Sequence, residues 1–291
     1  MARKPKNVMF RTSKQRIGND TKKFAAILIG CVVAVLAVSI FAILSKNDFN
    51  VKNVLGGDAP TETVPEQLIS QEAEIEASKT YLFWCADDSG TELRFAWLVN
   101  LELPERKASV CTLDLNRRIA FGSETQSMRH IFRQKGIKTL IACIEDETEI
   151  EIDGYIGSDD ESFKSMINYL GGIDITVPEQ IDYRSGDLTV VLVKGKQNLK
   201  GDTLFKYLRY LGTLDEKGRK LQSSAMNEIL DYVFRPANIN RCEYIFSKIS
   251  NSLETDLTIV DYSSAEQGIK LFIENGFAKK RVVETPEELT D

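Results

Sequence analysis

Residues 194–224 read KGKQNLKGDTLFKYLRYLGTLDEKGRKLQSS, and the local fold can be predicted from them. A first helix is expected to open at the turn of Gly201 and to place Leu204, Leu208 and Leu211 on one stripe. Side chains three and four residues apart lie on the same face of a helix. The helix is therefore expected to pack against the rest of the domain through these leucines.

A second helix is expected to begin at Arg219, because Ala225, Ile229 and Val233 follow at helical spacing. Arg209 lies on the flank of the first helix, so two arginines bracket a loop that contains glycine. Free backbone N–H groups at a helix start attract anions, and a guanidinium can donate two parallel hydrogen bonds to phosphate. The pattern predicts an anion-binding pair; two surface ion-pair residues are the alternative that spacing alone leaves open.

The same stretch resembles the C-terminal motif block of the LytR-CpsA-Psr family, which attaches lipid-linked glycopolymers to peptidoglycan in bacterial envelopes. In that family the run reads roughly kG-x-q-x-L-x-G-x-x-A-L-x-Y-x-R-y-R, followed by G-D-x-x-R-x-x-R-Q. Here KGKQNLKGDTLFKYLRYL precedes LDEKGRKLQSS. The resemblance implies that Arg209 and Arg219 neutralise charge on a leaving group. Leu211 and Gln222 replace two of the family's arginines, and Glu216 falls beside its loop aspartate.

Two acids, Asp87 and Asp88, follow a predicted buried strand at Tyr81–Cys85. Paired acids in a turn often serve only the turn itself. The family, however, starts its domain with a hydrophobic strand and a G-x-D turn whose aspartate helps to hold a magnesium ion, and Asp87 stands at the matching place. The resemblance therefore implies a Mg²⁺ site at Asp87, with Asp88 and Glu216 as further ligands.

The hairpin that follows departs from the family. The S-D-T element of the family falls on Leu93–Phe95, where the nearest acid is Glu92, and its P-R-D element falls on Asp114–Asn116, where leucine replaces the arginine. Arg117 and Arg118 follow at once and are expected to supply the missing cation as substrate-binding residues. Gln222, on the inner margin of its predicted helix, is expected to join them as a neutral donor.

The N-terminal part carries the pattern of a membrane anchor. Phe24–Leu44 is 21 residues long without a charge, enough to cross a bilayer of about 30 Å. Residues 1–23 hold eight Lys or Arg against one acid, which predicts a cytoplasmic N-terminus and an extracytoplasmic remainder. No A-x-A cleavage motif ends the apolar run, so an uncleaved anchor is favoured over a signal peptide. Residues 45–79 have the composition of a linker.

Charge and reactive side chains limit the possible functions. The chain carries a net charge of −6, and because residues 1–23 contribute +7, the remainder carries −13. Such an acidic domain is not expected to bind nucleic acid. The only histidine, His130, cannot form a zinc cluster by itself, and the five scattered cysteines are expected to be free thiols.

Alternating strand-like and helix-like runs over residues 80–276 predict an α/β domain with a mixed central sheet and helices on both faces. Strands are expected at Tyr81–Cys85, Phe95–Leu103, Ala108–Leu115, Ile137–Ile144, Glu149–Asp153 and Ile173–Pro178, and helices at Ser123–Lys135, Glu161–Leu170, Tyr244–Leu253 and Ser263–Gly276. Residues 168–178, NYLGGIDITVP, also resemble the family's GGV-D-V-x-V-P signature. Residues 277–291 are expected to be a frayed, charged tail.

The resemblance implies phosphotransfer of a glycopolymer from an undecaprenyl-pyrophosphate carrier to peptidoglycan, by a protein anchored in the cell membrane. Because cationic positions are lost, polyprenyl-pyrophosphate binding is expected to persist while transfer is attenuated. A non-catalytic binder of polyprenyl pyrophosphate or of wall polymer is the alternative. Transcriptional regulation, suggested by an older family name, is disfavoured because the domain is expected outside the membrane.

Overall fold

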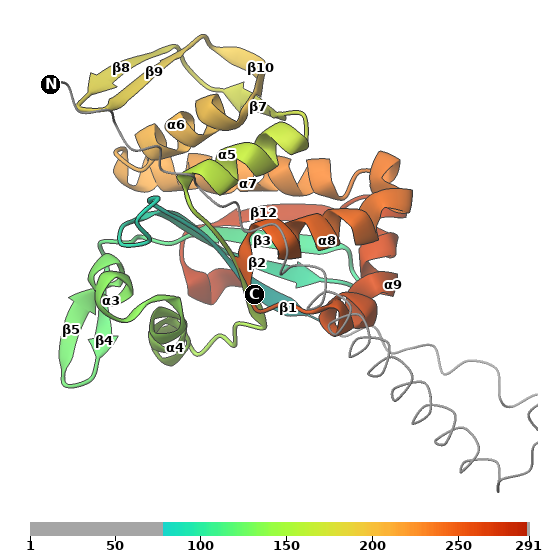
Figure 1. Cartoon of the computed structure of the whole chain (residues 1–291), viewed down its shortest axis with the longest axis horizontal. Helices are drawn as coiled ribbons and strands as arrows, with labels where there is room; N and C mark the ends of the chain where they lie inside the picture. Colours follow the sequence, from blue (N-terminus) through green and yellow to red (C-terminus); the bar gives the residue numbers. More distant parts are fainter. Residues whose placement is uncertain (1–77, 290–291) are drawn as a thin grey trace, which may run out of the picture. The chain divides into compact units, whose positions relative to one another are not determined.

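A six-stranded sheet forms the centre of the computed structural model, which describes residues 78–289 (Figure 1). Its strands, in spatial order, are β11 (Glu254–Thr255), β6 (Gly154–Ser158), β1 (Lys79–Ala86), β2 (Leu93–Glu102), β3 (Lys107–Thr112) and β12 (Lys279–Val283). The pairs β1–β6 and β3–β12 are parallel, and the other three pairs are antiparallel. The mixed central sheet is therefore confirmed.

Helices cover both faces of this sheet (Figure 1). Along β1, Leu82 and Trp84 belong to one core and Cys85 to the other, as expected from the alternation of side chains in a strand. The first core is covered by α3 (Met128–Lys135) and α4 (Ile137–Thr148), and the second by α5 (Asp160–Tyr169), α6 (Gly201–Leu211) and α7 (Asp215–Val233). Two further helices, α8 (Cys242–Ser252) and α9 (Ile259–Asn275), lie beside the second core.

Short elements complete the described part of the chain. A hairpin of β4 (Arg118–Phe121) and β5 (Glu124–Ser127) precedes α3, and β7 (Ile173–Val177) pairs with β10 (Gly195–Leu199) around the hairpin of β8 (Ile181–Ser185) and β9 (Leu188–Leu192). Two 3₁₀ turns, η1 (Pro236–Arg241) and η2 (Pro286–Leu289), follow α7 and β12.

The first predicted helix is confirmed as α6, since Leu204, Leu208 and Leu211 are each at most 1% exposed. The second helix, α7, begins at Asp215 and not at Arg219. Asp215 and Glu216 lie in its first turn, where carboxylates interact favourably with the positive end of the helix dipole. Arg219 therefore lies one turn inside α7, beyond the free N–H groups of the helix start.

The run Ile137–Ile144, predicted to be a strand, is the first part of α4. Ile137, Leu140 and Ile144 are buried at helical spacing, and the acids that follow continue the helix to Thr148. Glu149 caps it in a left-handed conformation with φ 57°. The predicted strand at residues 149–153 is wrong as well, because these residues form no ladder.

Other boundaries differ from the prediction as well. The helix expected from Ser123 begins at Met128, because residues 124–127 form β5 and Ser127 caps the helix by accepting a hydrogen bond from the backbone N–H of His130. The segment expected to fray after residue 276 forms β12, which pairs with β3, and then η2, whose Leu289 is fully buried. Residues 277–289 are therefore part of the folded domain.

The predicted anchor Phe24–Leu44, the basic residues before it and most of the linker lie outside the described residues. Within residues 78–289, no helix combines the length and apolar character that crossing a membrane requires. Four cysteines of this range are free thiols; Cys85 and Cys111 are buried, whereas Cys143 and Cys242 are half-buried.

Candidate anion-binding site

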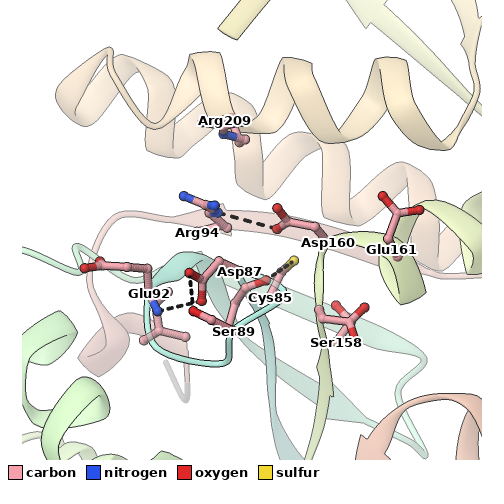
Figure 2. Close-up of polar contacts among 12 residues, drawn as sticks. Cys85, Asp87, Ser89, Glu92, Arg94, Ser158, Asp160, Glu161 and Arg209 are labelled. Carbon is pink, nitrogen blue, oxygen red and sulfur yellow. Dashed lines mark hydrogen bonds and ion pairs between the residues drawn. The ribbon is translucent and has the colours of Figure 1, made fainter. Parts of the chain in front are cut away.

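The turn between β1 and β2 is organised by Asp87. One carboxylate oxygen accepts the backbone N–H groups of Thr91 and Glu92 at 2.8 and 2.9 Å, and the other accepts the hydroxyl of Ser89 at 2.7 Å (Figure 2). Partial burial acts to raise the pKa of Asp87, but the hydrogen bonds from Ser89 and Thr91 and the charge of Arg94 outweigh it and lower the pKa. Asp87 is therefore held ionised as the acceptor of its own turn.

Replacing Asp87 with alanine is expected to lower the free energy of unfolding at pH 7 by about 1 kcal/mol, a value reduced for solvent screening. Because the folded-state pKa is depressed, this stabilisation is complete above the unfolded pKa of about 3.9 and is lost as pH falls through the folded value. Urea unfolding of both proteins at pH 7 and below pH 4 measures this. Asp88→Ala, which removes an exposed carboxylate of the same turn, is the control. If Asp87→Ala lowers the free energy of unfolding by the same amount at both pH values, Asp87 does not stabilise its turn as a carboxylate.

Arg94 lies where β1 and β2 lose regular pairing. Cys85 pairs with Phe95 and Ala86 with Leu93, so Arg94 is the additional residue of a β-bulge. Such a bulge re-aims the side chain it carries. Its Nε lies 3.4 Å from Oδ1 of Asp160, the first residue of α5; Asp160 is buried and Arg94 is half-buried (Figure 2). Burial raises the pKa of Asp160, and the guanidinium of Arg94 acts against that rise.

The charge of Arg94 also acts on the surroundings of two further arginines, Arg209 and Arg129. Arg209 of α6 makes a two-pronged ion pair with Asp187, at 2.9 and 3.2 Å, and the charge of Arg94 adds to the lowering of the pKa of that carboxyl. Arg129 of α3 donates to the carbonyl of Leu93; burial lowers its pKa, and the like charge of Arg94 lowers it further.

Arg219 extends this arginine cluster on α7. It lies 3.4 Å from Asp114, whose charge also opposes the lowering of the pKa of Arg129. We call Arg94, Arg129, Arg209 and Arg219 the arginine cluster. Arg209 and Arg219, the two cations that the sequence predicted, thus each pair with a carboxylate of another element.

The other predicted substrate-binding residues lie elsewhere. Arg117 pairs with Glu147 of α4 at 3.2 Å, and Arg118 donates to Thr125 across the β4–β5 hairpin. Gln222 is 3% exposed, and its amide nitrogen donates to the carbonyl of Leu208 at 2.7 Å. Gln222 therefore adds a second hydrogen bond to a carbonyl at the end of α6 that also accepts the backbone N–H of Gly212, a structural role.

The acids predicted to hold Mg²⁺ do not form a coordination group. Asp88 is exposed, and Glu216 lies on α7, where it pairs with Lys220 at 2.9 Å. Within residues 78–289 no three His, Cys, Asp or Glu side chains gather so as to hold a metal ion. Since Asp87 is also engaged by its turn, this donor set does not fit the predicted magnesium site.

Two apolar cavities of about 190 and 110 Å³ lie between the sheet and the helices α7 and α8. Both are lined by Phe83 and Ile156 of the sheet and by Met226, Ile229 and Ile245 of the two helices. Polar atoms contribute little to either wall. Their lining residues are shared, so the cavities adjoin and form one apolar compartment.

No arginine lines the smaller cavity, but two of its lining residues connect it through neighbouring side chains to Arg94 and Arg209. Ser158, which lines it, stands two residues before Asp160, the partner of Arg94. Phe163 also lines it and packs against Phe205, and the guanidinium of Arg209 lies 5.8 Å from the centre of the Phe205 ring. An apolar compartment with arginines beyond its lining residues is suited to an amphiphile that has an anionic head.

Sequence reasoning missed Arg94, Asp160 and Arg129 as site residues. A signal for Arg94 was present, because a charge between Leu93 and Phe95 interrupts an otherwise apolar strand. The bulge that turns it towards Asp160 depends on the pairing register and has no signature in the sequence. Asp160 is 75 residues after Cys85 in the chain. The parallel pairing of β1 with β6 places Ser158 beside Cys85, and this brings Asp160 to the same end of the sheet as Arg94.

Comparison with known proteins gives a consistent family. A model of the LytR_cpsA_psr family matches residues 108–287. The polyisoprenyl-teichoic acid–peptidoglycan teichoic acid transferase TagV of Bacillus subtilis (strain 168) is 27% identical over 168 residues, which are 55% of this chain and 41% of TagV. The match thus spans less than half of that relative's length.

Solved structures share the fold. The crystal structure of B. subtilis TagV superposes with a TM-score of 0.59 at 21% identity, covering 72% of this chain and 85% of that one. The structure of the LytR-CPS2A-psr family protein YwtF (TagT) with bound octaprenyl pyrophosphate lipid gives a TM-score of 0.52 at 17% identity, covering 75% and 81%. With the family model matching well over half of the sequence, the chain belongs to the LytR-CpsA-Psr family.

Proposed function

We propose that this protein binds a polyprenyl-pyrophosphate-linked glycopolymer at the cell envelope and transfers it to peptidoglycan only weakly. The observation that carries the proposal is the apolar compartment whose lining residues Ser158 and Phe163 lie next to the partners of Arg94 and Arg209. Its walls suit a hydrocarbon chain, and the two neighbouring guanidinium groups suit a pyrophosphate. TagT, a structural relative, has a structure with bound octaprenyl pyrophosphate lipid, which supports the same ligand class here.

The residues proposed to bind the pyrophosphate are arginines. A pyrophosphate is recognised best by guanidinium groups, which donate paired hydrogen bonds and stay charged at any physiological pH. Arg209 and Arg219 are the residues that would neutralise the phosphate released on transfer. Both now have carboxylate partners, Asp187 and Asp114, that an incoming pyrophosphate would replace.

We propose attenuated transfer because two positions that carry a cation in the family motifs carry a buried leucine here. Leu115 is 6% exposed and Leu211 is 1% exposed, so neither side chain faces a ligand. A preorganised donor at a reacting centre commonly contributes a hundred- to a thousandfold in rate. Binding without any transfer is the second candidate, and these two buried leucines are the observation that favours it.

The cellular setting is part of the proposal. TagV carries the name of a teichoic acid transferase that uses peptidoglycan as acceptor, and a carrier lipid of this kind lies in a membrane. The uncharged run Phe24–Leu44 is proposed to anchor the chain with its N-terminus in the cytoplasm, which places the domain on the side where peptidoglycan is built.

Filling the apolar compartment tests the proposal. Ile229→Trp is expected to lower affinity for octaprenyl pyrophosphate at least tenfold, because displaced prenyl surface loses about 25 cal/mol per Å² of burial. Affinity for isopentenyl pyrophosphate, whose single prenyl unit does not need the compartment, is expected to stay unchanged. Isothermal titration calorimetry measures both affinities.

The matched control is Val191→Trp, which adds an indole to an exposed position of β9. It is expected to alter neither affinity. An unchanged affinity of Ile229→Trp for octaprenyl pyrophosphate would place the prenyl chain elsewhere and remove the main support of the proposed function.

A further inference from the structure

The charge arrangement around Arg94 differs from that of a metal site. Arg94 interrupts an apolar strand between Leu93 and Phe95, and its bulge turns it towards Asp160. This cation is paired with Asp160 and is close enough to lower the pKa of Asp87. Asp160 is therefore already paired with a positive charge, and the same charge acts on Asp87.

Magnesium would find few ligands here. It requires hard oxygen donors in near-octahedral geometry. Both oxygens of Asp87 accept hydrogen bonds from the turn, and Asp160 faces the guanidinium of Arg94. A divalent cation at this position would also be repelled by that guanidinium.

Arg94 retains donors for a ligand. Among the residues that the structure describes, its Nε contacts Asp160, and no hydrogen bond is found for its two terminal nitrogens. Asp160 is held in place by its position at the start of α5, so the guanidinium is oriented without its outer edge being used. That edge supplies the planar, paired donors that bind phosphate oxygens in bidentate fashion.

We propose that Arg94 takes the place of the magnesium ion, so that this protein binds the pyrophosphate of a polyprenyl pyrophosphate without a divalent metal. The inference rests on the proposed function and adds to it the identity of the charge that meets the head group. Arg94 acts as a binding residue, Asp160 as the residue that positions it, and Arg209 as the cation on the facing helix (Figure 2).

Octaprenyl pyrophosphate binding, measured by titration calorimetry on the full-length protein in detergent, tests this. The unaltered protein is expected to bind with the same affinity in excess EDTA as in millimolar MgCl₂. Arg94→Ala is expected to bind ten- to a hundredfold more weakly in both buffers, the usual effect of losing charge-assisted hydrogen bonds. Arg184→Ala, which removes an exposed arginine of β8, is the control and is expected to change neither value.

A charge reversal adds a second readout. Arg94→Asp places a third carboxylate between Asp87 and Asp160, so this variant is expected to bind Mn²⁺, detected by electron paramagnetic resonance without any lipid. The unaltered protein is expected to leave Mn²⁺ free in the same measurement. Thermal unfolding of each variant checks that the domain is folded.

The possible results distinguish a failure of the role of Arg94 from a failure of the proposed function. Binding by the unaltered protein that requires MgCl₂, or Mn²⁺ binding by the unaltered protein, would overturn the role of Arg94 while leaving the proposed function standing. Equal affinities of Arg94→Ala and the unaltered protein would also overturn it. Absence of binding in both buffers would overturn the proposed function itself.

Discussion

Glycopolymer transfer by this protein is expected to be at least a hundredfold slower than transfer by TagV of B. subtilis under the same conditions. Two cationic positions of the family motifs, Leu115 and Leu211, are apolar here, and each lost donor commonly costs a hundred- to a thousandfold in rate. A reconstituted assay with a polyprenyl-pyrophosphate-linked teichoic acid and peptidoglycan, in the presence and absence of MgCl₂, measures the ratio.

Restoring one cation is not expected to restore the rate. Leu211 is 1% exposed within the core formed by α6 and α7, so Leu211→Arg would bury an unpaired charge and destabilise the domain. The packed core around Leu211 therefore does not accommodate a cation at this position. Robust transfer by the unaltered protein would show that Arg94 and Arg129 fully replace the missing donors, and the attenuated function would be wrong.

Gly218→Ala is expected to destabilise the domain by about 3 kcal/mol, at the upper end of overpacking effects. A methyl group at Gly218 would overlap the carbonyl oxygen of Leu211, because the first turn of α7 crosses directly over the end of α6. Backbone atoms, unlike the end of a flexible side chain, cannot move aside without shifting a helix. The helices that carry Arg209 and Arg219 would therefore separate.

Urea unfolding measures this loss, and Gly212→Ala supplies the comparison. A methyl group there would approach the carbonyl of Arg209 at 3.3 Å and meet a side-chain amide at 3.4 Å, so a change of less than about 1 kcal/mol is expected. A loss at Gly218 that is no larger than the small loss expected at Gly212 would mean that α6 and α7 do not approach each other this closely.

The α/β class and most helices were predictable because their patterns are local. The leucines of α6 recur at helical spacing and need no tertiary information. The error at α4 arose because Ile137–Ile144 is short and apolar enough for either structure, and the acids that extend it were assigned to the next element. Segment β12 was missed because its strand character comes from pairing with β3, about 170 residues earlier in the chain, and not from its charged sequence.

The site was predictable only in part. Motif order points to Arg209 and Arg219, which pair with Asp187 and Asp114 in the structure, and their role in binding stays a prediction. Arg117 and Arg118 were reasonable substitutes by sequence distance, but β4 and α4 hold them in other contacts. Arg94 required knowledge of the bulge, and Asp160 required the β1–β6 pairing. The residues of a site that is assembled from distant strands therefore cannot be identified from local sequence spacing.

The central claim is that one amphiphile fills the apolar compartment and places its pyrophosphate against the arginine cluster. A crystal structure of the protein with octaprenyl pyrophosphate, grown in EDTA, tests it most directly. Phosphate oxygens are expected within hydrogen-bonding distance of Arg94 and Arg209, with the prenyl chain passing Ile229 between the sheet and α8. A prenyl chain outside this compartment, or a pyrophosphate that contacts neither arginine, would contradict the account.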